Sequence, residues 1–413
     1  MWPLQLFTYN IGLQLYRLGI GIAAPFNIKA KQWIDGRKSA IPVVKKKNGD
    51  KVVWVHCASL GEFEQARPVI EAIKAADSNI KLVLTFFSPS GYEIRKDYKH
   101  ADLVLYLPLD TKANAVTFIN SIKPDVALFV KYEFWYHYLH TLKLQGIPVL
   151  LFSAIFRPKQ IFFKPHGGLY RSILGFFSKI YVQNETSALL LQSMNTPAEI
   201  ARDTRFDRVI TIAEGHNQYP LLEAFKANHK VLIAGSTWPK DEALIKDCIA
   251  GAILTNYKYI IAPHNINQAE VDYLVKQIPN AIKWSELNQA NAEQAQVIIV
   301  DNIGHLSHIY AYADIVYVGG GFNASVHNVL EPAVYGIPII FGPNHTKSNE
   351  ALELQYKKAA FAVTDTQSLT KVLTKLENDE GKLRKEAGSI AKQYVYMNQG
   401  GTKQIMDYII KLL

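Results

Sequence analysis

The sequence predicts an α/β protein with two doubly wound, Rossmann-like domains that face a central cleft. Its 413 residues exceed what one hydrophobic core usually fills, so two domains of about 200 residues each are expected. From residue 50 onward, short apolar runs alternate with helical segments, which is typical of parallel strands joined by helices. The pattern occurs in both halves, on either side of a polar segment, 195–219, that we expect to be a linker. Open α/β sheets bind ligands beyond the carboxyl ends of their strands, so a shared cleft is the expected site.

Each expected element follows from an apolar run of strand or helix length. In the first half the expected strands are Val52–His56, Leu82–Phe86, Leu103–Tyr106, Val126–Val130, Val149–Phe152 and Ile180–Gln183. The expected helices there are Glu62–Ala75, Thr111–Ile122 and Tyr132–Gln145. In the second half the expected strands are Val231–Ala234, Tyr259–Ala262, Val297–Val300, Ile315–Val318 and Ile339–Phe341. The expected limits are a segment 1–28, domains 29–205 and 206–395, and a segment 396–413 whose helix, Gly400–Leu413, is expected to cross back to the first domain.

Positive charge is concentrated in the first half of the chain. Residues 1–210 hold 27 Lys and Arg against 16 Asp and Glu, a net of +11, and residues 211–413 hold 18 against 20, a net of −2. An anionic membrane, an acidic substrate or a nucleic acid would suit such a half. The sequence has no zinc-ligand spacing, RNA-binding aromatic pattern or recognition-helix pattern, which argues against nucleic acid. The two cysteines, Cys57 and Cys248, are far apart and indicate buried thiols in a reducing compartment.

The first 28 residues are apolar with a single charge, Arg17. A secretory signal would carry basic residues before its apolar run, and a spanning helix would not usually hold an arginine near its middle. A helix lying in the membrane interface fits better, because seven Lys and Arg residues follow between Lys29 and Lys47. The alternative is an ordinary buried first helix, and this segment alone does not decide between the two.

A glycine-rich run follows an expected strand of the second half. After Val318 come three glycines, Gly319 to Gly321, and further on Asn328 and Glu331. Glycines let a backbone approach a ligand closely, and a helix expected to open near Asn328 would offer amide groups to a phosphate. Glu331, one turn later, is placed to accept hydrogen bonds from a ribose. A tight turn with a capped helix is the alternative, and we favour the nucleotide interpretation because of the spacing of Glu331.

Two further loops of this half carry polar side chains after a strand. Ser236 and Thr237 suit a phosphate, although Ser and Thr before an acidic residue are also an ordinary helix cap, which the spacing alone favours. His264 ends another strand and suits a base or phosphate, but a lone histidine is more often structural.

The first half offers one carboxylate in a position for catalysis. Glu62 follows a strand at the start of a helix, where a carboxylate with a suitable pKa can deprotonate an acceptor hydroxyl. Ser59 and Glu62 also have the spacing of a capping box, and from spacing alone the cap is the better interpretation.

Taken together and in order, these runs resemble those of the Kdo transferases, which are glycosyltransferases of the GT-B architecture. The similarity extends from about Trp54 to Gln355. The runs are Ser59-Leu-Gly-Glu62; Thr85-x5-Gly91; Leu107-Pro-Leu-Asp110; Pro124-Asp125 with Glu133-Phe-Trp135; Gly146-Ile-Pro148; Arg205-Phe-Asp207; Gly235-Ser-Thr237; Val318-Gly-Gly-Gly321; His327-Asn328-x2-Glu331-Pro-Ala333; and Phe341-Gly-Pro343. Any one run is common, whereas the ordered set is specific.

The resemblance implies an inverting transfer of 3-deoxy-D-manno-octulosonic acid (Kdo) from CMP-Kdo to a lipid A precursor at the cytoplasmic face of the bacterial inner membrane. It implies no metal and no cofactor, with Glu62 as general base and Glu133 as a second carboxylate of the cleft. Arg205 would face an anionic group of donor or acceptor. The nucleotide sugar would be held by Ser236, Thr237, His264, Gly304, Gly320, Gly321, Asn328 and Glu331.

The chain departs from the family pattern where the family often has Pro-Arg-His and this sequence has Pro263-His264-Asn265. The resemblance then implies that one cationic contact to the nucleotide is missing or is supplied from elsewhere in the chain. A different GT-B enzyme that uses a UDP-sugar on a lipid acceptor, and a catalytically idle membrane-bound binder of nucleotide or glycolipid, are the alternatives to the expected reaction.

Overall fold

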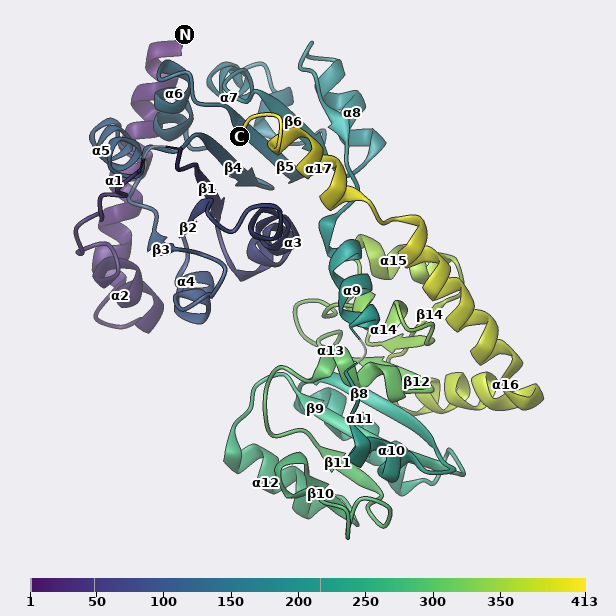
Figure 1. The fold of residues 1–413 in the computed structure, drawn as a ribbon. Coiled ribbons are helices and arrows are strands. Elements are labelled where there is room, and N and C mark those ends of the chain that lie inside the picture. The colour runs from purple at the N-terminus through teal and green to yellow at the C-terminus, as the bar shows by residue number, and fades with distance from the viewer. Residues whose placement is uncertain (1, 48, 216) are drawn as a thin grey trace. The chain divides into compact units, whose positions relative to one another are not determined.

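The computed structural model describes residues 2–47, 49–215 and 217–413 and divides the chain into two compact units (Figure 1). The first unit is Met1–Asp207 with Gln399–Leu413, and the second is Arg208–Asn398. The expected linker carries a short strand, β7 (Glu199–Ile200), and a helix, α9 (Thr204–Glu214). Met1 of the apolar segment and His216 of the expected linker lie outside the described residues.

The first unit is built on a seven-stranded sheet, counted over the described residues, in the order β3-β2-β1-β4-β5-β6-β7. Its strands before β7 are β1 (Val52–Cys57), β2 (Lys81–Phe86), β3 (Leu103–Tyr106), β4 (Val126–Val130), β5 (Val149–Ala154) and β6 (Lys179–Val182). All neighbours pair in parallel. The chain winds outward in one direction from β1 to β3 and in the other from β4 onward. The topological switch point, where such sheets bind ligands, therefore lies between β1 and β4.

The second unit repeats this design with the order β10-β11-β9-β8-β12-β13-β14, again seven strands among the described residues. The strands are β8 (Lys230–Thr237), β9 (Tyr257–Pro263), β10 (Ala281–Lys283), β11 (Val297–Ile299), β12 (Ile315–Val318), β13 (Ile339–Phe341) and β14 (Ala360–Ala362). Neighbours are again parallel. Its switch point lies between β8 and β12. The predicted fold class of two doubly wound sheets is confirmed.

Helices cover both faces of each sheet, which is why the central strands read as nearly continuous apolar runs. The helices of the first unit are α1 (Trp2–Ala23), α2 (Ile28–Asp35), α3 (Leu60–Ala76), α4 (Pro89–Arg95), α5 (Lys112–Ile122), α6 (Tyr136–Leu144), α7 (Gly168–Leu174), α8 (Glu185–Gln192) and α17 (Gly401–Ile409). Those of the second are α10 (Pro220–Lys226), α11 (Pro239–Ala250), α12 (Gln268–Gln277), α13 (Leu306–Ile309), α14 (Leu330–Ala333), α15 (Asn349–Tyr356) and α16 (Thr366–Met397), and α9 crosses the boundary. Several begin at a residue whose side chain accepts a backbone N–H, as at Thr111 and Asp365.

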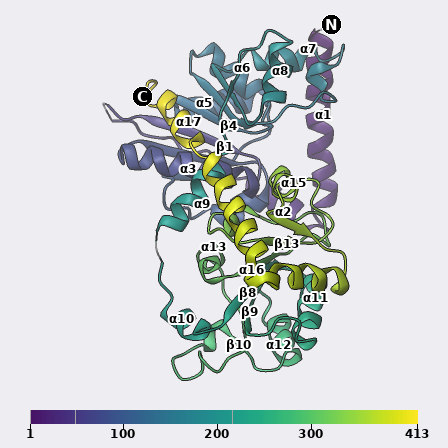
Figure 2. The same cartoon turned by 90° about the vertical axis from the view of Figure 1, so that its right-hand side faces the viewer.

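The last helix, α17, packs on the first unit (Figure 2). Its residues Ile405 and Ile409 are fully buried in the same core cluster as α3. The carboxylate of Asp207 accepts the backbone N–H groups of Gly400 and Thr402 at 2.6 and 2.7 Å. These bonds satisfy amides at the start of α17, which lack partners within the helix.

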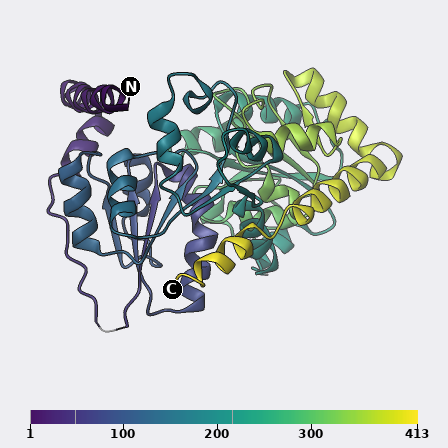
Figure 3. The ribbon, with the colours of Figure 1, turned by 90° about the horizontal axis from the view of Figure 1, so that it is seen from above.

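The N-terminal helix α1 lies at the margin of the first unit, where Figure 3 views it nearly end-on. One face is fixed to the unit: Tyr9 donates to the buried Asp110 at 2.5 Å, and the Gln5 amide donates to the carbonyl of His166 and accepts the N–H of Leu169 at the start of α7. The other face carries exposed apolar side chains at Leu4, Phe7, Ile11, Leu15, Leu18 and Ile22. Their spacing of three or four residues forms one stripe along the helix. Among the described residues, no helix has the length and apolar character to cross a bilayer.

One expectation about helices is wrong, for the segment around Glu133, and one helix that is present as expected, near Asn328, is very short. The helix expected from Tyr132 begins at Tyr136, because Lys131 has a left-handed backbone (φ 67°) and turns the chain before the helix. Glu133 therefore lies in a loop. The helix expected to open near Asn328 is the single turn α14, too short to build up a helix dipole.

Candidate active site

Glu62 stands beside the switch point of the first unit, in the first turn of α3 directly after β1. Ser59 occupies the N-cap but makes no side-chain bond to the backbone; its hydroxyl donates to the Glu62 carboxylate instead. The capping-box interpretation is therefore wrong. The Glu62 carboxylate is half-buried, and its position is fixed by the hydroxyl of Ser59.

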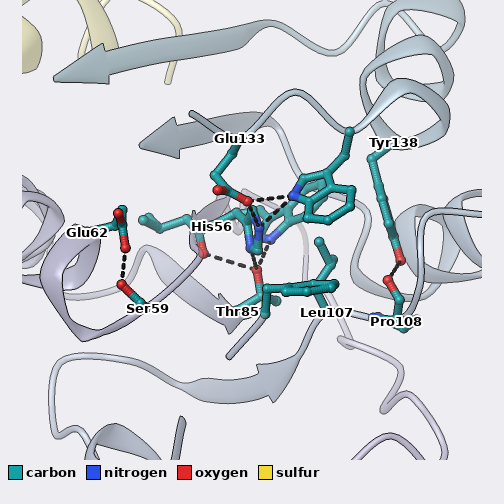
Figure 4. Close-up of polar contacts among 12 residues, drawn as sticks. His56, Ser59, Glu62, Thr85, Leu107, Pro108, Glu133 and Tyr138 are labelled. Atoms are coloured by element: carbon teal, nitrogen blue, oxygen red, sulfur yellow. Dashed lines mark hydrogen bonds and ion pairs between the residues drawn. The ribbon is translucent and has the colours of Figure 1, made fainter. Parts of the chain in front are cut away.

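Glu133 stands on the other side of the same switch point, in the loop after β4 (Figure 4). Its Oε2 accepts from Trp135 Nε1 at 2.5 Å and lies 2.9 Å from His56 Nε2. The second imidazole nitrogen, Nδ1, is 2.9 Å from the hydroxyl of Thr85, which in turn accepts from Trp54 Nε1 at 2.8 Å. Buried groups on β1 and β2 therefore hold the carboxylate at the end of β4.

One assignment of hydrogens satisfies the bonds from Trp54 to Glu133 with a neutral imidazole, and Trp135 Nε1, which is also 3.2 Å from His56 Nε2, then donates to Glu133 alone. Trp54 N–H donates to the Thr85 hydroxyl, and that hydroxyl donates to Nδ1 of His56. The imidazole then carries its proton on Nε2 and donates it to Glu133. The carboxylate thus receives two N–H donors on one oxygen.

Both carboxylates act on one buried thiol at the end of β1. Burial, followed by the negative charges of Glu62 and Glu133, raises the pKa of Cys57 well above its usual range. Glu62 follows β1 and Glu133 follows β4, and these two strands are neighbours in the sheet. The switch point of the first unit therefore presents two acidic groups, one in the first turn of α3 and one in the loop after β4. Two such groups can share the work of orienting and deprotonating a hydroxyl.

Arg205 is engaged within the first unit. Its guanidinium binds the buried carboxylate of Asp203 at 2.7 Å, and Asp203 also accepts from Gln65 and Gln183. The charge of Arg205, with these bonds, keeps the pKa of Asp203 below its usual range despite burial. The expected contact of Arg205 with an anionic substrate group stays a prediction.

The expected nucleotide loops meet at the switch point of the second unit. Gly319 N donates to Gly235 O at 2.9 Å, so the loops after β12 and β8 lie against each other. A Cβ on Gly319 would come within 2.3 Å of the backbone oxygen of Ser236, so only glycine fits there. Ser236 itself has a left-handed backbone (φ 54°), a conformation that costs about 1 kcal/mol or more for a non-glycine residue. The sheet thus holds a strained backbone at its ligand-binding edge.

Buried Asp241, on α11, accepts hydrogen bonds from several of the N–H and O–H groups at this edge of the sheet. Its Oδ2 accepts the backbone N–H groups of Trp238 and Gly320, both at 3.0 Å, and its Oδ1 accepts from Tyr317 at 2.7 Å. The amide of Gly320, expected to bind the nucleotide, therefore already has a carboxylate partner. Gly321 is required for another reason, since a Cβ there would lie 2.5 Å from the backbone of Gly342.

The remaining predicted residues of this unit surround the same edge. Thr237 donates to Glu242 at 3.1 Å, and Asn328 donates to Glu331 at 3.0 Å. Gly304 lies in the exposed loop after β11 with a left-handed backbone (φ 97°). His264 follows β9 and stacks on His327 with ring centroids 4.2 Å apart.

The structure thus places Glu62 and Glu133 at the carboxyl edge of the first sheet and most of the expected nucleotide residues at that of the second. Arg205 lies with Asp203 outside both groups, and Gly304 lies on the separate loop after β11. Among the described residues, no cluster of three or more His, Cys, Asp or Glu side chains has a geometry suited to a metal ion. The sequence patterns assigned no role to His56, Thr85, Asp241 or His327, although Thr85 and His327 belong to the motif runs shared with the Kdo transferases. His56 alternates with apolar residues on a buried strand, and that pattern was its only signal.

Superposition on solved structures identifies the fold of the chain. The UDP-GlcNAc 2-epimerase from Neisseria meningitidis superposes with a TM-score of 0.61 at 16% identity over 87% of this chain and all of that one. MurG from Acinetobacter baumannii gives 0.56 at 16% identity, over 87% and 99% of the two chains. The fold is the GT-B fold.

Sequence comparison shows similarity to one family of glycosyltransferases over most of the chain. Residues 34–208 match the model of the 3-deoxy-D-manno-octulosonic-acid transferases, or Kdo transferases. The Kdo transferase of Aquifex aeolicus is 27% identical over 85% of this chain and 93% of its own length, and that of Haemophilus influenzae 24% over 86% of each. A bifunctional glycosyltransferase/methyltransferase of Fusobacterium nucleatum is 25% identical over 90% of this chain, which spans 59% of that protein. The resemblance to the Kdo transferases predicted from the motifs is confirmed.

Proposed function

We propose that this enzyme transfers Kdo from CMP-Kdo to a lipid A precursor, with inversion and without a required metal, at the cytoplasmic face of the bacterial inner membrane. The observation that carries the proposal is the pair of carboxylates, Glu62 and Glu133, at the switch point of the unit that matches the Kdo transferase model. The named activity of the relatives supplies the sugar, and the CMP-linked donor is what the resemblance in the motifs implies.

In this mechanism Glu62 acts as the general base. It takes the proton from the acceptor hydroxyl while the oxygen attacks the anomeric carbon of Kdo, and the bond from that carbon to the CMP phosphate breaks. The electron pair leaves with CMP as a phosphate monoester, so the configuration inverts. Glu133, fixed by His56 and Trp135, orients the acceptor through hydrogen bonds to its hydroxyl groups.

The N-terminal helix supports a site at the membrane surface. The apolar stripe on α1, from Leu4 to Ile22, faces away from the unit, and the first half of the chain carries the excess positive charge. Apolar area buried in the interface and attraction to anionic lipids act together in such helices. Because α1 is also tied to Asp110 through Tyr9, point changes on its outer face are a sharper test than its deletion.

The test is transfer of Kdo from CMP-Kdo onto a tetraacylated lipid A precursor, read by mass spectrometry in EDTA. A gain of one or more Kdo units supports donor, acceptor and metal independence together. CMP-Kdo left intact while a UDP-sugar is transferred would replace the proposal with the UDP-sugar alternative, and no transfer from any donor would favour the idle binder.

The role of Glu62 is tested with Glu62→Gln, and Glu64→Gln is the matched control. Glu64 lies in the same turn of α3 but pairs on the surface with Arg95 at 2.9 Å. We expect Glu62→Gln to lower kcat by about 10²–10⁴-fold, the usual contribution of a general base, and Glu64→Gln to change it little. Equal activity of the two variants would remove Glu62 from its role.

A further inference from the structure

Three aromatic rings from separate loops meet at the carboxyl edge of the second sheet. The ring of His264 lies nearly parallel to that of His327 (15°, centroids 4.2 Å) and to the indole of Trp238 (25°, centroids 5.0 Å). Trp238 Nε1 also donates to His327 Nε2 at 3.0 Å. These rings follow β9, the glycine run after β12, and β8, and so they adjoin the switch point.

Other sources of anion binding at this edge are limited. The backbone N–H groups of Gly319 and Gly320 already donate to Gly235 and Asp241. The single turn α14 has little dipole. Buried Asp241 adds a negative charge behind the glycine run. A phosphate that binds here therefore needs a positive charge from a side chain.

The two histidines are not equivalent as sources of that charge. Nε2 of His327 accepts the indole N–H, so this ring is neutral with its proton on Nδ1, and a second proton would break the bond to Trp238. Burial and then the neighbouring His264 lower the pKa of His327 to about 4. His264 is exposed to solvent, and no hydrogen bond to its ring nitrogens is found among the described residues. His264 is therefore the imidazole that a ligand can reach and that is able to gain a proton.

We propose that His264 is a proton-linked anion receptor: it is neutral in the free enzyme and takes up one proton when the phosphate of the nucleotide donor binds beside the glycine run. This proposal rests on the proposed CMP-linked donor. The ring is exposed at one side but partly desolvated by its surroundings, and this partial burial lowers the pKa of free His264 below its ordinary value, so near neutral pH the ring starts uncharged. A phosphate within about 4–6 Å raises the pKa of an imidazole by about 1–3 pH units, enough to protonate it near pH 7. The faces of Trp238 and neutral His327 then add cation–π attraction to the new charge.

The charged groups on the surrounding elements do not protonate His264 in advance. On α11, Asp241 is occupied by three donors, Glu242 accepts from Thr237, and Lys240 is exposed and cationic. On α14, Glu331 accepts from Asn328. The extra charge appears when the anion arrives, so binding of the donor is stronger at lower pH between the pKa of the free ring and that of the bound ring.

The test is the number of protons taken up with CMP, measured by calorimetry at pH 7.5 in buffers of different ionisation enthalpy. We expect uptake of roughly half to one proton per CMP in the wild type and none with cytidine, which lacks the phosphate. His264→Gln should abolish the uptake and weaken CMP binding about tenfold or more near pH 7. His264→Arg, with a permanent charge, should restore binding without uptake, which a merely structural role would not do.

Each other outcome decides against part of the argument. Proton uptake that persists in His264→Gln would assign the proton to the CMP phosphate or to His327 and would overturn the proposal. If proton uptake were lost in His327→Gln but not in His264→Gln, the proton would be assigned to His327. Tight CMP binding without uptake would overturn the proposal and leave the proposed function intact. No binding of CMP at any pH would remove the CMP-linked donor itself, and this proposal with it.

Discussion

Replacing His327 with glutamine should make the second unit more resistant to acid. Glutamine keeps an acceptor for the indole N–H of Trp238, so the variant loses the titratable group without losing the hydrogen bond. Above pH 6.5 the histidine is neutral in both the folded and the unfolded states, and the two proteins should therefore differ little there.

The sign of the effect follows from the direction of the pKa change. In the folded unit the pKa of His327 is lowered from 6.5 to about 4. Below pH 6.5 His327 is protonated in the unfolded chain but not in the folded unit. The free energy of unfolding that is present above pH 6.5 is therefore lost progressively as the pH falls toward 4. At ~1.4 kcal/mol per pH unit the full loss is about 3 kcal/mol. Because the ring is partly exposed and screened by solvent, we expect about 1–2 kcal/mol.

A two-unit protein need not unfold in one step, so the measurement must report on the second unit alone. Hydrogen exchange of peptides that cover β12, followed against urea at pH 4.5 and 7.5, gives the free energy of opening of that sheet. The wild type should lose about 1–2 kcal/mol more than His327→Gln between the two pH values.

A second titrating group supplies the internal control. Burial raises the pKa of Asp110, in the first unit, from 3.8 to about 6. Its contribution has the opposite sign, since stability present below pH 3.8 is lost as the pH rises through about 6. Peptides of the first unit should therefore show the same pH dependence in both proteins. Equal acid sensitivity of β12 in wild type and variant would refute the reasoning about His327.

Three further predictions concern separate parts of the molecule. Trp135→Phe removes the N–H that donates to Glu133, and we expect kcat for transfer to fall about 10–100-fold with KM changed less; unchanged kcat would show that the bond is not needed. In Gly319→Ala the new Cβ would clash with the backbone of Ser236, and we expect the second unit to be destabilised by about 1–3 kcal/mol in thermal unfolding. Gly12→Ala, whose Cβ would have no atom within 4 Å, should not be destabilised, and equal melting of the two variants would contradict the close approach of Gly319 to Ser236. Leu15→Asp on the outer face of α1 should weaken sedimentation with anionic vesicles about tenfold or more, and undiminished sedimentation would contradict the membrane role of that face.

The central strands were predictable because each is a short apolar run buried on both faces. Val52–His56 and Val126–Val130 were expected within a residue of β1 and β4 as observed. The edge strands β7, β10 and β14 were not predicted. They have two or three residues and mostly partly exposed side chains, so they lack the apolar run that identifies a buried strand.

Local spacing was less informative about the site. Ser59 and Glu62 have the spacing of a capping box, but the serine donates to the carboxylate instead of accepting from the backbone. Glu133 was expected inside a helix, but it lies in a loop because the left-handed backbone of Lys131 turns the chain before the helix begins. In both places a short-range pattern was compatible with two geometries, and the packing at the strand ends selected one.

By itself, the sequence determined the class of fold, the order of the strands along the chain and the resemblance to the Kdo transferases, because apolar periodicity and ordered motifs are properties of a linear chain. Only the tertiary structure decided which polar side chains meet. Parallel sheets place β1 beside β4, and β8 beside β12, although long segments of chain separate them. For that reason the contacts of His56 with Glu133, and of His264 with Trp238 and His327, could not be read from spacing: each joins loops that become neighbours only when the strands take their places in the sheet.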